Sequence, residues 1–402
     1  MLNFYSASVR SANTERAVNE CLEVLSKDNT NLSKDCRIII VNATLGHPLE
    51  KIALFIKERL PDTLVLGASC SGVTGKEGVG ESMNEIAVMA VCGERGDCDA
   101  HSVNNIFASN SYEKGLELAR NLKLKTDDPV AVYLLCSGID IASDLVLQAF
   151  EEVFGENIII GGGTSSDNMR GLVNYQYLGD ILAEHGAWAV AFSDKTLNAI
   201  TRATHGFVAG GEPMTVTKSE GNKIIELNGK PAWEEYTAKI GIKGNSPSEI
   251  LAMGALAEEL STELAEEYGN THILRGIGRS GGHNEKGHII YPTTIKEGVK
   301  FWLTERNEDL IFSEQEKSLE FLKNKTDGRR TVAIFQSDCL VRGRLLFNKI
   351  MKDEIILMMQ NALSSEGAVP PWIGIYGFGE YARLGGKNMY HNYTTALLVL
   401  YR

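Results

Sequence analysis

Apolar runs alternate with amphipathic stretches along this chain in an order that returns three times. In the first group, residues 37–41 and 85–91 are predicted as buried strands, because each is apolar after its first residue and such runs are typical of strands covered on both faces. Between them, residues 47–60 have helical spacing, and residues 63–72 form a strand that opens into small residues. The predicted group is a strand, a helix, a strand ending in a glycine turn, and a closing strand.

The second and third groups follow the same order. The second has strands at 130–135, 157–167 and 187–192 and a helix at 142–153; the third has a strand at 331–335, a helix at about 342–362 and the tail from 370. A strand-helix-strand crossover places its two strands side by side, parallel and right-handed. We therefore predict the α/β fold class, built from repeated strand-helix-strand units with glycine loops at strand ends. A generic α/β pattern without true repetition is the alternative.

A mixed α+β composition separates the second group from the third. Strands at 213–219 and 222–227 with a tight turn at Asn228–Gly229 are predicted, followed by a helix starting near Pro231. An acidic helix over 249–268 and a hairpin made of 287–292 and 299–304 complete this region. We place a boundary near residue 200, which gives domains 1–200 and 201–402.

Composition narrows the classes of function. Of the 402 residues, 43% are hydrophobic and 23% charged, as in ordinary globular proteins, and the net charge of −12 disfavours nucleic acid and anionic membrane surfaces. No secretory signal and no apolar run of about 20 residues is present, so we expect no membrane span. Seven cysteines, an odd number without C-x-x-C, indicate reduced thiols in the cytoplasm.

Glycine loops at the ends of the predicted strands are the first candidate site. Open α/β sheets bind ligands at the carboxyl ends of their strands, and three such loops meeting in space would form a small polar pocket. Simple strand exits with room for close packing are the alternative. The candidate ligand-binding residues are Gly67, Ser69, Cys70, Ser71, Gly162, Gly163, Thr164, Arg342, Gly377, Glu380 and His391. Among them, Arg342 could clamp a carboxylate, and His391 could face the Glu380 loop as a donor.

Other motifs favour ordinary structural roles. Residues 276–281 match the dinucleotide fingerprint G-x-G-x-x-G, but a turn follows where the fingerprint needs a helix. His283 and His288 lie in a turn-rich loop without a third metal ligand. Cys136 and Cys339 are better explained as buried thiols than as nucleophiles, since no base stands at a recognisable spacing.

Six of these segments together resemble the FIST proteins. Residues 65–75, 160–167 and 216–232 resemble the N-terminal FIST part, and residues 337–343, 374–380 and 391–394 resemble the C-terminal part. The resemblance implies a small-ligand sensor of bacterial signal transduction, often fused or linked to histidine kinases or cyclic-nucleotide enzymes, for which ligands such as amino acids have been proposed. One branch of similar proteins binds haem and senses nitric oxide. In that case His205 is the candidate axial ligand of a haem b, a usual role for a neutral imidazole.

We therefore expect a cytoplasmic stand-alone sensor, not an enzyme. It would bind its ligand between the repeated half and the second half and report to a partner such as a histidine kinase or a cyclic-di-nucleotide enzyme, because no kinase or cyclase segment is present. An enzyme using a cysteine or the Glu380 and His391 pair, and a ligand-free interaction scaffold, are the alternatives. The ligand and the oligomeric state, a homo-oligomer included, stay open.

Overall fold

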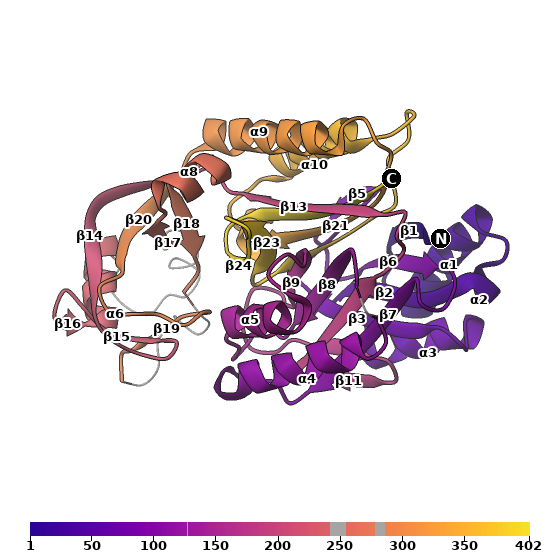
Figure 1. The fold of residues 1–402 in the computed structure, drawn as a ribbon, viewed down its shortest axis with the longest axis horizontal. Helices are drawn as coiled ribbons and strands as arrows, with labels where there is room; N and C mark the ends of the chain where they lie inside the picture. Colours follow the sequence, from indigo (N-terminus) through magenta and orange to yellow (C-terminus); the bar gives the residue numbers. More distant parts are fainter. Residues whose placement is uncertain (127, 242–254, 278–285) are drawn as a thin grey trace.

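The computed structural model describes residues 1–126, 128–241, 255–277 and 286–402. In this part of the chain, three six-stranded sheets form a body with helices on its outside, and a further sheet stands to one side (Figure 1). This arrangement confirms the predicted α/β fold class.

Each sheet of the body is built around one repeated unit. Unit 1 contains β1 (Asn3–Arg10), α1 (Thr14–Asp28), α2 (Leu32–Asp35), β2 (Cys36–Thr44), α3 (Leu49–Arg59), β3 (Leu64–Cys70) and β6 (Glu85–Cys92). Unit 2 contains β7 (Cys98–Asn104), η1 (Ala108–Asn110), α4 (Ser111–Lys123), β8 (Ala131–Cys136), α5 (Ser143–Phe154), β9 (Ile160–Thr164) and β12 (Gly186–Phe192). Unit 3 contains β13 (Asn198–Thr204), α9 (Glu308–Thr326), β21 (Thr331–Cys339), η3 (Leu340–Arg342), α10 (Lys349–Leu363), β22 (Trp372–Gly377) and β25 (Thr395–Tyr401).

The three sheets share one strand order, which confirms the internal repeat. The orders are β1-β6-β2-β3, β7-β12-β8-β9 and β13-β25-β21-β22. Within each, only the crossover pair is parallel, namely β2 with β3, β8 with β9, and β21 with β22. Each unit also begins with a strand and a helix that the sequence pattern did not assign to the repeat.

A hairpin from another unit completes every sheet. The hairpins are β4–β5 (Val73–Gly75 and Gly78–Gly80), β10–β11 (Gln176–Leu178 and Ile181–Ala183) and β23–β24 (Glu380–Leu384 and Lys387–His391). The unit 1 hairpin pairs with β22 of unit 3, the unit 2 hairpin with β3 of unit 1, and the unit 3 hairpin with β9 of unit 2. The units therefore exchange hairpins in a closed ring.

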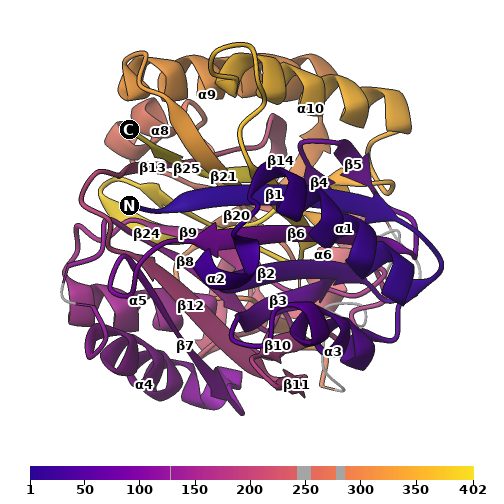
Figure 2. The same ribbon diagram turned by 90° about the vertical axis from the view of Figure 1, so that its right-hand side faces the viewer.

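The inner faces of the three sheets share a single apolar core. Leu66, Tyr133, Trp188, Phe335 and Leu398 belong to one buried cluster, although they come from all three units. The rings of Tyr133 and Phe335 lie 4.6 Å apart, centroid to centroid. On the outer faces, α1 and α3 cover the first sheet, α4 and α5 the second, and α9 and α10 the third (Figures 1 and 2). The body is thus a three-sided barrel-like layer of sheet inside a layer of helix.

Residues 207–306, here called the β-module, are inserted into unit 3 between β13 and α9. Its elements are β14 (Phe207–Glu220), β15 (Lys223–Leu227), β16 (Lys230–Pro231), α6 (Ala232–Ile240), β17 (Leu256–Glu259), α8 (Thr262–Tyr268), β18 (His272–Arg275), β19 (Ile289–Ile290) and β20 (Lys300–Arg306). The chain leaves and returns at one place, because a Cβ at Gly206 would lie 2.4 Å from the Cα of Ile311. In Figure 1 the β-module lies to the left of the body.

The β-module confirms two sequence predictions and corrects two others. Asn228 and Gly229 form the predicted turn with positive φ, and α6 begins after Pro231. The predicted acidic helix is wrong over residues 256–259, which form the strand β17. The helix α8 begins at Thr262, and residues 249–254 of the predicted helix lie outside the described part. The predicted hairpin is also wrong, because β19 pairs with β15 whereas β20 pairs with β14 and β17.

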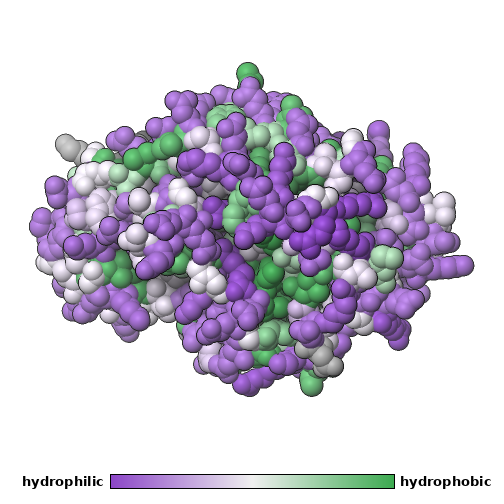
Figure 3. All heavy atoms as spheres, turned by 45° about the horizontal axis from the view of Figure 1, so that its top comes forward, coloured by the Kyte–Doolittle hydropathy of each residue, from purple (hydrophilic) through white to green (hydrophobic). Residues whose placement is uncertain are grey.

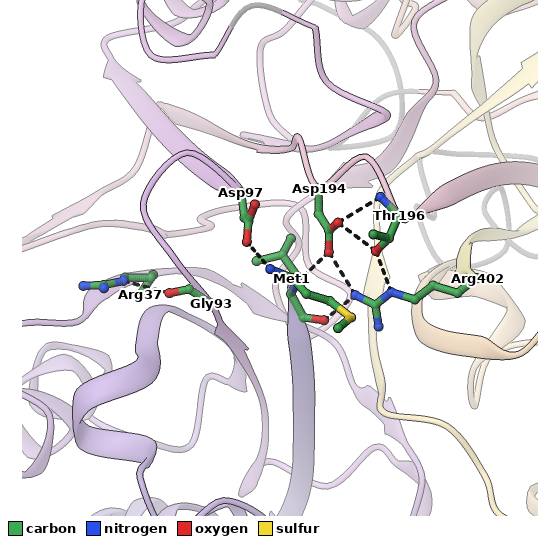
Figure 4. A network of polar contacts seen from close by, with 8 residues as sticks. Met1, Arg37, Gly93, Asp97, Asp194, Thr196 and Arg402 are labelled. Carbon is green, nitrogen blue, oxygen red and sulfur yellow. Dashed lines mark hydrogen bonds and ion pairs between the residues drawn. The ribbon is translucent and has the colours of Figure 1, made fainter.

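The first and last strands are tied together by Asp194 (Figure 4). The Asp194 carboxylate accepts hydrogen bonds from Leu2 N at 2.7 Å, from Thr196 and from Arg402 Nη2 at 3.0 Å. Burial alone would raise the pKa of Asp194, but these hydrogen bonds lower it to about 2. The carboxylate therefore stays ionised and links the sheets of units 1 and 3.

The surface and the helices were compared with what a bilayer requires. Among the helices of the described residues, none is long and apolar enough to cross a bilayer. The face drawn in Figure 3 is mostly hydrophilic, with hydrophobic residues in small separate groups. Singly exposed apolar residues, such as Ile350 and Leu357 on α10, are ordinary in globular proteins.

Candidate functional site

The three predicted glycine loops meet, but they fill the space between them. The Ser166 hydroxyl donates to Tyr376 O at 2.6 Å and accepts from Ser71 N at 3.0 Å, which joins the ends of β3, β9 and β22. Ser69 Oγ donates to Ser166 O at 2.9 Å. The loops thus bind one another, and a ligand-binding role for Ser69, Cys70, Ser71 and Thr164 stays a prediction.

The glycines of these loops permit close packing. Gly67 and Gly162 have φ of +153° and +129°, and an added Cβ would lie 1.8 and 1.9 Å from the carbonyl oxygens of the neighbouring strands. A Cβ at Gly163 would lie 2.3 Å from Gly379 O, and one at Gly377 would lie 2.1 Å from Thr164 O. The close-packing alternative therefore accounts for these four positions.

The loop after β9 wraps around the chain's own carboxylate. Asp167 is buried and accepts four backbone N–H groups, from residues 170–173, at 2.8–3.4 Å. A carboxylate with this many donors satisfies the loop amides internally. Asp167 consequently fixes the shape of this loop.

Arg342 lies buried between the body and the start of the β-module. Its Nη1 donates to His205 O at 3.0 Å and to Tyr393 O at 3.3 Å, and its guanidinium stacks 4.9 Å from the Phe347 ring centroid. It belongs to η3, and the helix predicted to start near it begins only at Lys349. Burial lowers the pKa of Arg342, and the nearby Asp338 carboxyl opposes that change. Its Nη1 is thus used by two backbone carbonyls and holds these chain segments together, and a ligand-binding role for Arg342 stays a prediction.

Glu380 and His391 face each other across β23 and β24, yet each side chain is bonded elsewhere. Glu380 Oε2 accepts from Thr394 Oγ1 at 2.8 Å, whereas Glu380 Oε1 is buried without a hydrogen-bond partner among the described residues. Burial raises the pKa of Glu380 well above its ordinary value, although the Thr394 hydrogen bonds lower it. Burial with one unpaired oxygen favours the protonated form of this carboxyl group.

Replacing Glu380 with Gln is expected to stabilise the protein more as the pH rises. Below the unfolded pKa, near 4.5, both states carry the proton and ionisation makes no difference. Above it, the unfolded state ionises while the folded state stays protonated, so the wild type loses up to about 1.4 kcal/mol per pH unit until the folded pKa is reached. Urea unfolding at pH 5 and pH 8 measures this change, with exposed Glu354→Gln as the control. An equal difference at both pH values would contradict a protonated Glu380.

His205 and His391 flank the Tyr268 ring, at centroid distances of 5.6 and 5.7 Å. His205 Nδ1 accepts from Phe207 N at 2.9 Å, so its Nε2 carries the proton and donates to His272 O at 3.0 Å. His391 Nε2 donates to Ala382 O at 3.2 Å, and Nδ1 accepts from the Tyr268 hydroxyl at 3.4 Å. Burial lowers the pKa values to about 4 for His205 and about 3 for His391.

This arrangement does not fit an axial haem ligand. Such a ligand needs a free lone pair on one imidazole nitrogen. In His205 one nitrogen accepts a backbone N–H and the other bears the proton, and the side chain is buried. The expectation that His205 binds the iron of a haem b is therefore not supported.

The seven cysteines are buried and unpaired. Burial raises the pKa of Cys136 to about 12 and the pKa of Cys339 well above its ordinary value. A thiol with a raised pKa is a poor nucleophile. These two cysteines thus have the environment of structural core residues.

A cavity of about 560 Å³ lies where the β-module meets unit 2. Small-molecule sites generally occupy about 300–1,000 Å³ and often lie between domains. The body contributes α5 and the β23–β24 hairpin, and the β-module contributes β17, β18, and residues 293–296 and 299. We call this cavity the module cleft.

Charged groups of both signs line the module cleft. Its charged residues are Asp144, Glu151, Glu258, Arg275, Lys296 and Lys387. Arg275 Nε binds Glu258 Oε2 at 3.3 Å, and its guanidinium donates to Tyr390 O across the cleft. Thr294 N donates to Asp144 Oδ2 at 3.0 Å, which joins the two walls again. Lys296 and Lys387 are exposed at the rim.

Comparison with models of known protein families gives matches in both halves of the chain. A model of the FIST N domain matches residues 37–230, and a model of the FIST C domain matches residues 232–383. This chain belongs to the FIST family. FIST domains are small-ligand sensor domains of signalling proteins.

The FIST protein was also compared with curated proteins and with solved structures. A search of the curated proteins found no match. Among solved structures, a cyanuric acid hydrolase is similar over the whole of both chains, with 9% identity and a TM-score of 0.38. T. maritima PurL complexed with ATP covers this whole chain and 71% of its own, with 10% identity and a TM-score of 0.23. Likenesses this distant carry no argument about function.

The module cleft lies between the two parts of the FIST protein. Asp144 and Glu151 belong to the FIST N match, whereas Glu258, Arg275 and Lys296 belong to the FIST C match. Sequence reasoning named none of these residues. Their only sequence signal is a charge on a predicted helix or loop, which solvated surfaces share. The predicted boundary near residue 200 stays a prediction.

Proposed function

We propose that this FIST protein senses a small polar ligand in the module cleft. The observation that carries the proposal is a cavity of metabolite size whose two walls come from the body and from the β-module. Carboxylates and cations both line it, so a ligand with groups of both charges would find partners on each wall. The glycine loops are less suitable, because the hydroxyls of Ser69 and Ser166 already bind neighbouring loops, although Ser71 Oγ and Thr164 Oγ1 have no partner among the described residues.

Occupancy would be reported through the position of the β-module. Direct polar contacts across the cleft join Arg275 to Tyr390 and Thr294 to Asp144. A ligand that touches both walls binds the closed arrangement better and shifts the population towards it, with a coupling of typically about 1–3 kcal/mol. The signal would pass to a partner enzyme, for which a histidine kinase or a cyclic-di-nucleotide enzyme is proposed. The unpaired thiols support a reducing compartment, the cytoplasm.

Replacing the two rim lysines is expected to abolish the thermal shift that a bound ligand produces. A ligand at 100 times its Kd stabilises a protein by about 2.7 kcal/mol, so a metabolite screen by differential scanning fluorimetry detects it. Lys296→Ala and Lys387→Ala remove cations at the cleft without touching the core. Lys34→Ala, on exposed α2, is the matched control.

The outcomes separate the alternatives. A ligand-induced thermal shift that persists in both lysine variants would show that the ligand binds outside the module cleft. A library that shifts nothing would favour the ligand-free scaffold. Turnover that depends on Cys339 or on the Glu380 and His391 pair would favour an enzyme. A Soret band in the wild-type protein that is absent from His205→Ala would favour a haem-based nitric oxide sensor. The His205 ring in this structure has no free lone pair for such a ligand.

A further inference from the structure

Two thiols of unit 1 face each other across neighbouring strands. Cys36 of β2 and Cys92 of β6 are directly opposed partners in an antiparallel pair. Opposed residues in such a pair have Cα atoms about 4.5–5.5 Å apart, within the range of about 4.4–6.8 Å that a disulfide requires. Both side chains belong to the apolar cluster beneath α1, so they lie on the same face of the sheet.

The strand β2 has a register shift at Arg37, next to this pair, and two contacts fix the backbone there. Arg37 Nε donates to Gly93 O at 3.0 Å, and Gly93 N donates to Asp35 O at 3.1 Å (Figure 4 shows Arg37 and Gly93). These contacts connect the residues next to Cys36 with the residue next to Cys92. The two thiols are therefore kept opposite each other by groups on both sides.

The surroundings give the two thiols different roles. Asn29 Nδ2 donates to Cys92 Sγ at 3.8 Å, and the Cys36 thiol also hydrogen-bonds with Cys92. The hydrogen bond from Cys36 lowers the pKa of Cys92, whereas the same bond and burial raise the pKa of Cys36 well above its ordinary value. Cys92 is thus the better nucleophile of the pair, whereas the Cys36 thiol keeps its proton and also donates to Ile38 O at 3.5 Å. The nearby Cys98 belongs to the cluster on the other face of the sheet, and burial raises its pKa to about 12.

We propose that Cys36 and Cys92 form a redox-active pair that a peroxide converts into a cross-strand disulfide. The Cys92 thiolate attacks one peroxide oxygen, an S–O bond forms, the O–O bond breaks, and the departing hydroxide takes a proton to become water. Cys36 then attacks the Cys92 sulfur, the S–S bond forms, and the second water leaves with the Cys36 proton. In sum, two thiols and one hydrogen peroxide give one disulfide and two waters. A reducing thiol reverses the change.

Peptide mapping of the full chain tests this pair. Trypsin places Cys36, Cys92 and Cys98 on the separate peptides 35–37, 77–95 and 96–114. After hydrogen peroxide treatment, alkylation and digestion without reductant, we expect peptides 35–37 and 77–95 to be joined, with the loss of two hydrogens. Dithiothreitol should release them as free thiols. Cys98→Ser should keep the linkage, and Cys92→Ser should lose it.

A trapping variant checks the order of the steps. In Cys36→Ser, the Cys92 sulfenic acid has no resolving thiol, so dimedone labelling of peptide 77–95 should appear that is absent from the wild type. A linkage of Cys92 to Cys98, or peptides that stay free in oxidised wild type with a native circular dichroism spectrum, would overturn the proposal. The wild-type map decides the matter even where a serine variant fails to fold.

Discussion

Residues 1–230 produced without the rest of the chain are expected not to fold into a stable domain, although they include the entire FIST N match. The sheet of unit 2 would lose the β23–β24 hairpin, and the β4–β5 hairpin would lose its partner β22. The shared core would lose Phe335 and Leu398 together with the other unit 3 side chains. Near-ultraviolet circular dichroism and size-exclusion chromatography should show an aggregating chain without fixed tertiary structure.

Two controls make this expectation specific. Adding residues 231–402 in trans should restore a native spectrum, because the missing strands then become available. Removing residues 207–306 and joining the ends with a short linker should leave the body folded, since Gly206 already lies beside Ile311. A monodisperse 1–230 fragment with cooperative unfolding would contradict the exchanged-hairpin architecture as a requirement for folding.

Replacing Arg342 with Met is expected to cost the protein about 3–5 kcal/mol of unfolding free energy, the usual result of removing one partner from a buried charged network. The side chain is 2% exposed. Its loss leaves the carbonyls of His205 and Tyr393 without their donor, and it removes the positive charge near Asp338 and Glu380. Guanidinium unfolding at fixed pH measures the difference.

Arg344→Met provides the matched control, because Arg344 lies two residues away and is exposed. Surface substitutions of this kind usually change stability by less than about 0.5 kcal/mol. Equal effects of the two substitutions would show that the Arg342 contacts contribute nothing specific. An Arg342→Met variant that is stable but no longer binds ligand would instead support a ligand-binding role for Arg342.

The repeated units were predictable because their strands are buried on both faces. Residues 38–41 are continuously apolar, and the structure places them in the middle of a sheet between β6 and β3. The exchange of hairpins leaves no such local mark. Val73 pairs with Ile375, a residue about 300 positions away, and no periodic pattern connects them.

The wrong helix prediction in the β-module has a physical cause as well. Residues 256–259 read Leu-Ala-Glu-Glu, which are good helix formers, but pairing with β18 and β20 on both sides overrides that local preference. At the site, sequence identified glycines, histidines and a carboxylate whose unusual composition reflects close packing and buried hydrogen bonds. The module cleft depends on residues from five separate segments, so only the folded chain brings them together.

The β4–β5 hairpin has a further consequence for the life of the newly made chain. Its residues leave the ribosome early, yet β22 starts only at Trp372. At synthesis rates of about 5–20 residues per second, the hairpin waits roughly 15–60 s for its partner strand. During that interval a strand edge of unit 1 is open to other chains, so crowding on polysomes and the supply of chaperones should govern the yield of this protein.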